Sequence, residues 1–174
     1  IVAVAVGLEK KKTLHRKTRR HDMPTIASAV ENCMRENDLK FQVVDPEKMV
    51  TRCGFSADNG DFSVFFIPDE KSQTLRVHAY CPNHVPEEHR LRACEFITRA
   101  NYGLRIGNFE MDMDDGELRY KVSVDVEGGE LTSKMVSNMK SYALLMMDRY
   151  YPGLMALLYG GASPADAVKL VEDR

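Results

Sequence analysis

The 174-residue sequence has no tryptophan, only four cysteines and no long apolar run. The cysteines are widely spaced, at positions 33, 53, 81 and 94, which disfavours a disulfide framework and favours a reducing compartment. No stretch approaches the roughly 18 apolar residues of a membrane-spanning helix, so the protein is expected to be at most peripheral to a membrane. The glycines lack the spacing of a phosphate-binding loop, and no cysteine or histidine lies in a local catalytic signature. We therefore expect neither an enzyme nor a nucleotide-binding protein.

The net charge is also small, at −2, but it conceals a strong asymmetry along the chain. Residues 1–20 contain seven basic residues and one acidic residue, a net charge of +6, so the remainder carries −8. The basic residues are Lys10, Lys11, Lys12, Arg16, Lys17, Arg19 and Arg20. An acidic body with a basic tail suggests an anionic partner for the tail.

We expect residues 1–22 to form this tail, either extended or as the remnant of an organelle-targeting presequence. The chain begins at Ile1 rather than Met, and apolar residues 1–8 precede a basic segment that is poor in acidic residues. Two further uses remain open: the tail could lie on a neighbouring subunit, or it could contact the phosphates of nucleic acid or anionic lipid. No aromatic residue is interleaved with the basic ones to stack on bases.

The rest of the chain has the patterns of an α+β domain. The order of predicted elements is α-β-β-β-α-β-β-α-α, with helices over 25–39 and 86–102, a long helix from Thr132 and a short one from Ser163. Strands are predicted over 49–57, 62–67 and 74–80, and a short extended segment over 41–44 precedes them. Pro152 lacks a backbone donor, so the long helix is expected to kink or restart there.

Residues 109–126 have the clearest pattern, because apolar and polar residues alternate on both sides of Asp115-Gly116. This dipeptide is typical of a two-residue type I′ hairpin turn. The cross-strand pairs predicted for such a turn are Met113–Leu118, Asp112–Arg119, Met111–Tyr120 and Glu110–Lys121. One face of the hairpin would then be apolar, and the other would carry opposite charges across the strands.

Two sets of residues have the chemistry of a metal site but not its spacing. The first set comprises Glu110, Asp112, Asp114 and Asp115; the second comprises Cys81, His84, His89 and Cys94. Acidic residues that alternate along a strand form a row and do not wrap a Ca²⁺ or Mg²⁺ ion. His89 and Cys94, five residues apart on a helix, lie about 140° from alignment and cannot share a Zn²⁺ ion easily. We therefore predict no metal site and no cofactor.

Candidate contact residues follow from the strand pattern. In the strand at 74–80, Leu75, Val77 and Ala79 are expected to point inward, and Arg76, His78 and Tyr80 outward. Arg119 and Lys121 lie on the polar side of the later hairpin. We predict that these five outward residues contact a partner.

Two features of the helices also bear on partners and stability. Adjacent Met146 and Met147 cannot both face the core, which suggests that part of the long helix covers a partner or a second copy of the chain. Asn101 is polar in the last turn of an otherwise apolar helix. Its amide is expected to satisfy backbone groups of the following loop rather than to bind a ligand.

Several short motifs carry a resemblance to a known family. They are RANYGL at 99–104, GNFEMD at 107–112, DGELRYK at 115–121, DVEG at 125–128, MDRYYPGL at 147–154 and YGGASP at 159–164. With these motifs the chain resembles the YbjN-domain family over roughly residues 25 to 172, most closely its cyanobacterial and plastid forms. The resemblance implies the fold of type III secretion chaperones: a five-stranded antiparallel sheet packed by helices, with no cofactor and no catalytic residues.

We therefore expect a YbjN-like domain over residues 23–174 that acts as a non-enzymatic protein-binding module. It would be a chaperone-like assembly factor or an accessory subunit of a larger organellar, photosynthetic complex, in the chloroplast stroma or on the stromal face of a membrane complex. The alternative is a regulatory or ribosome-associated protein that binds nucleic acid through its basic tail, with the mitochondrion or cytoplasm as the alternative location.

Overall fold

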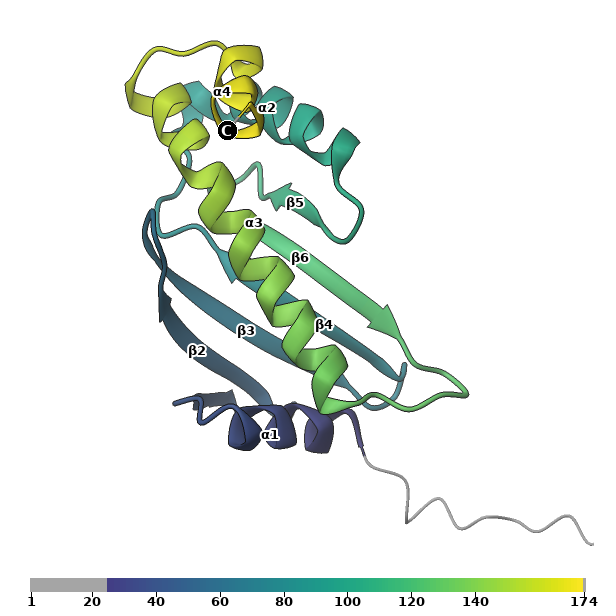
Figure 1. Cartoon of the computed structure of the whole chain (residues 1–174). Helices are drawn as coiled ribbons and strands as arrows, with labels where there is room; N and C mark the ends of the chain where they lie inside the picture. Colours follow the sequence, from purple (N-terminus) through teal and green to yellow (C-terminus); the bar gives the residue numbers. More distant parts are fainter. Residues whose placement is uncertain (1–24, 174) are drawn as a thin grey trace, which may run out of the picture.

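The computed structural model describes residues 25–173, which form a six-stranded antiparallel sheet with helices against it (Figure 1). The first elements are α1 (Ile26–Glu36), β1 (Gln42–Asp45), β2 (Val50–Ser56), β3 (Asp61–Asp69) and β4 (Thr74–Tyr80). They are followed by the 3₁₀-helix η1 (Glu87–His89), α2 (Arg90–Gly103), β5 (Asn108–Met111), β6 (Leu118–Asp125), α3 (Ser133–Tyr159) and α4 (Pro164–Glu172). The strand order is β1-β2-β3-β4-β6-β5. The expected α+β class is confirmed.

The prediction of five strands is wrong, because the short extended segment at 41–44 belongs to a sixth strand. In β1, Gln42 lies opposite Arg52 and Val43 opposite Thr51, and the register shifts before Asp45. Most of this strand is exposed on both faces, so it has no apolar alternation from which a strand could be predicted.

The core lies between α3 and one face of the sheet (Figure 1). Buried residues of α3 recur at helical spacing, and they pack on alternate residues of β3, β4 and β6. The α3 residues include Val136, Met139, Ala143, Met147 and Tyr150, and the strand residues include Phe62, Val64, Phe66, Leu75, Val77, Ala79, Leu118, Tyr120 and Val122. Of the adjacent methionines, Met147 is buried and Met146 is partly buried.

The long helix α3 continues through Pro152. Of the two predicted outcomes, a kink or a restart of the helix, the restart is therefore wrong. A proline inside a helix leaves the carbonyl four residues earlier without its usual donor. That carbonyl belongs to Asp148, and it accepts a hydrogen bond from Asn59 Nδ2 at 3.1 Å. The Asp148 carboxylate also accepts from the Asn59 backbone N–H at 2.8 Å. Pro152 thus frees an acceptor that helps to bind the β2–β3 turn to α3.

The β5–β6 hairpin has a wider loop than the predicted two-residue turn. Glu110 lies opposite Arg119 and Met111 opposite Leu118, so the predicted register is wrong by two residues. The loop closes because Gly116 N–H donates to the Asp112 carbonyl at 2.9 Å. A shift of two residues leaves each side chain on its predicted face, since side chains in a strand alternate with a period of two.

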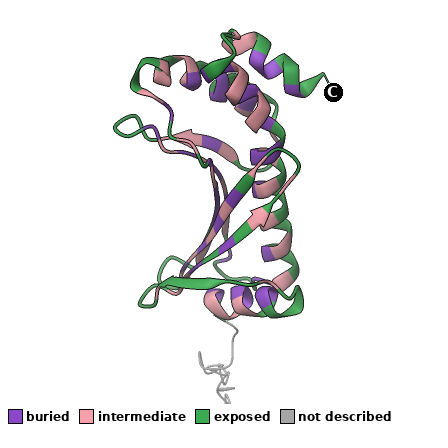
Figure 2. Cartoon of the chain, turned by 90° about the vertical axis from the view of Figure 1, so that its left-hand side faces the viewer, coloured by how far each residue is buried: buried purple, intermediate pink, exposed green. Residues whose placement is uncertain are grey.

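The opposite face of the sheet is not covered by any helix of the described residues. Seen from the side, the sheet is concave on this face, and α3 lies along the other (Figure 2). We call this uncovered surface the open face. Antiparallel sheets commonly leave one face to solvent, but then polar residues normally dominate it.

Candidate partner-binding face

The structure brings the five predicted outward residues together on the open face. Arg76, His78 and Tyr80 come from β4, and Arg119 and Lys121 come from the neighbouring β6. His78 lies opposite Lys121, and Tyr80 lies opposite Arg119. The alternation of these strands therefore places all five side chains on one surface.

Two residues of the open face were missing from the sequence prediction. Phe65 on β3 lies opposite both His78 on β4 and Arg52 on β2. The run Phe62–Ser63–Val64–Phe65–Phe66–Ile67 contains apolar residues on both faces, so its pattern does not show which of them point outward. We call Arg52, Phe65, Arg76, His78, Tyr80, Arg119 and Lys121 the open-face cluster.

One carboxylate holds two of the cations in place. Glu110 on β5 pairs with Arg119 at 3.1 Å and also forms an ion pair with Lys121. Although partial burial alone would raise the pKa of Glu110, the hydrogen bonds from Lys121 and Arg119 lower it below its ordinary value. The expected charge complementarity across β5 and β6 is thus present, with Glu110 as its centre.

The aromatic rings of the cluster pack against each other and under guanidinium groups. Phe65 and Tyr80 meet edge to face, with ring centroids 5.0 Å apart. The Arg52 guanidinium lies 5.9 Å from the Phe65 ring centroid, and that of Arg119 lies 6.0 Å from the Tyr80 centroid. Arg52 is fixed further by two hydrogen bonds to Ser63 Oγ, at 3.1 and 2.8 Å. These contacts hold the surface in one arrangement.

His78 is buried beneath this surface, with only 3% of its area exposed. Its Nδ1 lies 3.4 Å from the Tyr80 hydroxyl, and its Nε2 has no hydrogen-bond partner among the described residues. Burial, followed by the positive charges of Arg119 and Arg76, lowers the pKa of His78 to about 4. The imidazole is therefore neutral at pH 7.

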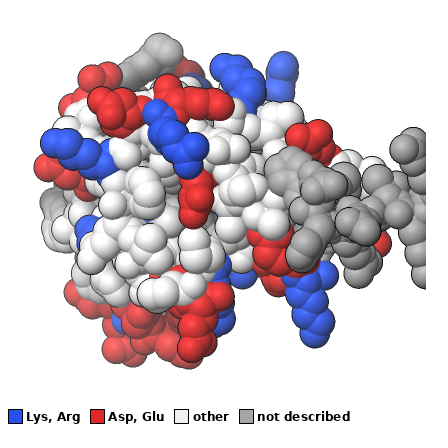
Figure 3. Space-filling model, turned by 90° about the horizontal axis from the view of Figure 1, so that it is seen from below, with Lys and Arg blue, Asp and Glu red and all other residues white. Residues whose placement is uncertain are grey.

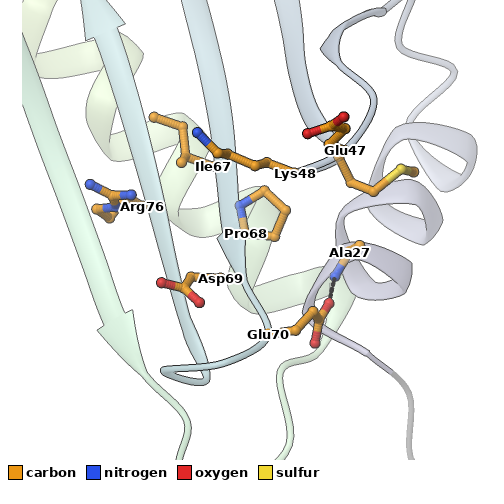
Figure 4. Close-up of a pocket in the computed structure, with 9 residues that line it drawn as sticks. Ala27, Glu47, Lys48, Ile67, Pro68, Asp69, Glu70 and Arg76 are labelled. Atoms are coloured by element: carbon orange, nitrogen blue, oxygen red, sulfur yellow. Dashed lines mark hydrogen bonds between the residues drawn. The ribbon is translucent and has the colours of Figure 1, made fainter.

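A cavity of about 420 Å³ adjoins the cluster at Arg76 (Figure 4). It lies where the N-terminal end of α1 meets the β1–β2 and β3–β4 loops. Its lining residues are Ala27, Glu47, Lys48, Met49, Ile67, Pro68, Asp69, Glu70 and Arg76. Apolar atoms of Met49, Ile67 and Pro68 thus lie beside several charged groups.

Two of the cavity's carboxylates are engaged in the fold. Glu70 caps α1 by accepting hydrogen bonds from Ala27 N at 2.8 Å and Ile26 N at 3.1 Å (Figure 4). Asp69 accepts backbone hydrogen bonds within the β3–β4 loop, and these bonds, chiefly those of Ser72, lower the pKa of its carboxyl group. Neither carboxylate forms an ion pair with Arg76, which has no ion-pair or hydrogen-bond partner within residues 25–173.

The other predicted residues lie elsewhere. The basic residues of the tail, Lys10, Lys11, Lys12, Arg16, Lys17, Arg19 and Arg20, are outside the described residues. Between residues 25 and 173 no three His, Cys, Asp or Glu side chains gather as a metal site would require.

Figure 3 views the end of the molecule that carries α1 and shows groups of acidic side chains with basic ones between them. No helix between residues 25 and 173 has the length and apolar character needed to span a bilayer.

Comparisons with known proteins give one family match. The model of the YbjN family, described as "Putative bacterial sensory transduction regulator", matches residues 27–155. A search of curated protein sequences found no match. Among solved structures, the one described as "Structure of the HopA1-SchA Chaperone-Effector Complex" is similar to this chain at 18% sequence identity and a TM-score of 0.44. The similarity covers 70% of this chain and 88% of that chain.

Proposed function

The chain belongs to the YbjN family, and we propose that it is a non-enzymatic module that binds a protein partner across the open face of its sheet. The observation that carries this proposal is the one-sided covering of the sheet. Helices pack on one face, whereas the other presents aromatic rings and cations that are fixed by ion pairs and ring contacts. Aromatic and arginine side chains are enriched where proteins bind one another.

The partner is proposed to be a component of a larger assembly, for which this protein is a chaperone-like assembly factor or an accessory subunit. The resemblance of its motifs to plastid forms supports an organellar, photosynthetic complex in the chloroplast stroma or at a stromal membrane face. The basic tail would then add an electrostatic attachment to an acidic surface.

The segregation of charge supports a second candidate, in which residues 1–22 bind nucleic acid. Deletion of residues 1–20 tests whether the tail attaches to an anionic partner at all. If the tail contacts an anionic partner, its deletion weakens salt-sensitive attachment and leaves the domain folded. Nuclease treatment of the purified assembly then distinguishes the partners: release by nuclease supports nucleic acid, and retention supports a protein.

Photo-cross-linking tests the use of the open face. We replace Phe65 with p-benzoylphenylalanine in the full chain and irradiate cells that express it. The control carries the same group at Leu145, which is 57% exposed on α3, the helix on the other face of the sheet. The proposal predicts a discrete protein adduct at position 65 and none at 145. Adducts at position 145 alone would place the partner on the face that carries α3 and would contradict the proposal.

A further inference from the structure

We propose that the open face recognises an extended acidic peptide segment, with a carboxylate bound at Arg76 and an adjacent apolar side chain in the neighbouring cavity. This inference rests on the proposed function, because it names the chemical class of the partner that the same face binds.

The distribution of ion pairs on the open face favours a carboxylate. Arg119 and Lys121 already share the carboxylate of Glu110, and Arg119 also contacts Glu117 at 3.4 Å. Arg76 is exposed and has no such partner within residues 25–173. A guanidinium group can donate two parallel hydrogen bonds to a carboxylate, a geometry that gives both affinity and orientation.

The cavity beside Arg76 favours an apolar side chain next to that carboxylate. Ile67 and Pro68 contribute its apolar wall (Figure 4), together with Met49. Its volume of about 420 Å³ lies within the range of roughly 300–1,000 Å³ of small-ligand sites. In an extended segment every second side chain points to the same side, so an acidic residue and an apolar residue two positions away reach the surface together.

His78 lies beneath this surface and does not itself reach the occupant. It is two residues from Arg76 on the same side of β4, and only 3% of its area is exposed. Arg76 is therefore the polar site that lies beside the apolar one.

Nucleic acid is a poorer fit to this face than an acidic peptide. Single-stranded nucleic acid binds by stacking its bases on the faces of exposed aromatic rings. Here guanidinium groups already lie over both rings: Arg52 over Phe65 and Arg119 over Tyr80.

Selection from a random peptide library tests the inference without knowledge of the natural partner. Phage that display random dodecapeptides are selected on the full chain, on Arg76→Gln and on the control Arg105→Gln. Arg105 is exposed in the α2–β5 loop, so the control removes the same charge from a residue outside the open-face cluster. We expect the wild type and R105Q to enrich peptides with an acidic residue two positions from an apolar one. We expect R76Q to lose this preference.

The best selected peptide is then labelled, and its binding is compared with that of a labelled dodecathymidylate by fluorescence anisotropy. Loss of one charge-assisted contact predicts affinity that is about tenfold weaker for R76Q and unchanged for R105Q. Three results overturn the inference: no enriched peptide, enrichment without acidic residues, or tighter binding of the oligonucleotide. If any of these occurs while cross-linking at position 65 still succeeds, the proposed function stands and only the acidic-peptide specificity is wrong.

Discussion

At the scale of single residues, side-chain amides join elements that are distant along the chain. Asn101, in the last turn of α2, accepts a hydrogen bond from the Phe109 backbone N–H at 2.7 Å and donates to its carbonyl at 3.1 Å. The predicted structural role of Asn101 is therefore confirmed, but its partner is Phe109 in β5 and not the loop around Gly103 to Gly107. The pairing of Asn59 with Asp148 could not be predicted, because 89 positions separate the two residues and no local pattern connects them.

Replacement of Asn101 by alanine should lower the free energy of unfolding by about 2 kcal/mol, because the Phe109 N–H loses its side-chain acceptor. For a chain of this length the melting temperature should fall by about 4–8 °C. The matched control is Asn138→Ala on the exposed side of α3, which should leave thermal unfolding nearly unchanged. Loss of partner binding at unchanged stability would assign Asn101 to the binding site instead.

His78 should make stability depend on pH. Its folded-state pKa of about 4 lies below its ordinary value of 6.5, so between these values the unfolded chain binds a proton that the folded chain does not. The free energy of unfolding should therefore fall as the pH is lowered through this window, by up to about 1.4 kcal/mol per pH unit. Arg76, Arg119 and Lys121 oppose protonation, whereas Glu110 favours it.

Urea unfolding at several values between pH 4 and pH 7 measures this dependence. In His78→Gln the side chain cannot titrate, so the slope over this range should be smaller than in the wild type. Other titrating groups contribute equally to both proteins, and the difference between the two slopes isolates His78. Equal slopes would mean that His78 titrates alike in the folded and unfolded chains.

At the scale of elements, the sequence predicts faces better than register. The alternation in 109–126 predicts which side chains of β5 and β6 point together, and the structure confirms it. The turn is wider because two loop carboxylates accept hydrogen bonds from backbone N–H groups two residues later. The Asp112 carboxylate accepts from Asp114 and the Asp115 carboxylate accepts from Glu117, each at 2.8 Å. Several loop lengths are compatible with the same alternation, so the pattern alone cannot select one.

Gly116 shows what fixes this loop. Its φ is +79°, and a Cβ at this position would lie 2.1 Å from the Val85 carbonyl oxygen. Gly116→Ala should therefore destabilise the protein by about 3 kcal/mol, from the left-handed backbone and from displacement of the loop. Gly128 has a φ of +75° but no atom within 4 Å of such a Cβ, so Gly128→Ala should cost only about 1 kcal/mol. Equal losses in urea unfolding would show that contact with Val85 does not constrain the loop.

At the scale of the whole molecule, the sequence predicts a single α+β domain and most of its element order. It does not predict β1, which has no buried face, or the cavity beside Arg76, which is formed where α1 and two loops meet. Five of the open-face residues could be predicted from the alternation of two strands. Their neighbours Arg52 and Phe65 could not, because they join the cluster only through pairing of β2 with β3 and of β3 with β4.

Quantitative affinity purification from source cells tests whether partners bind the open face. Tagged wild type, Arg76→Glu and the control Arg105→Glu are recovered at native abundance, and co-purifying proteins are compared by isotope-labelled mass spectrometry. Both residues are exposed, so both variants should keep the thermal stability of the wild type. We predict that R105E retains the wild-type partner and that its recovery with R76E falls about tenfold. Equal recovery of that partner with all three proteins would mean that the partner does not bind the open face at Arg76.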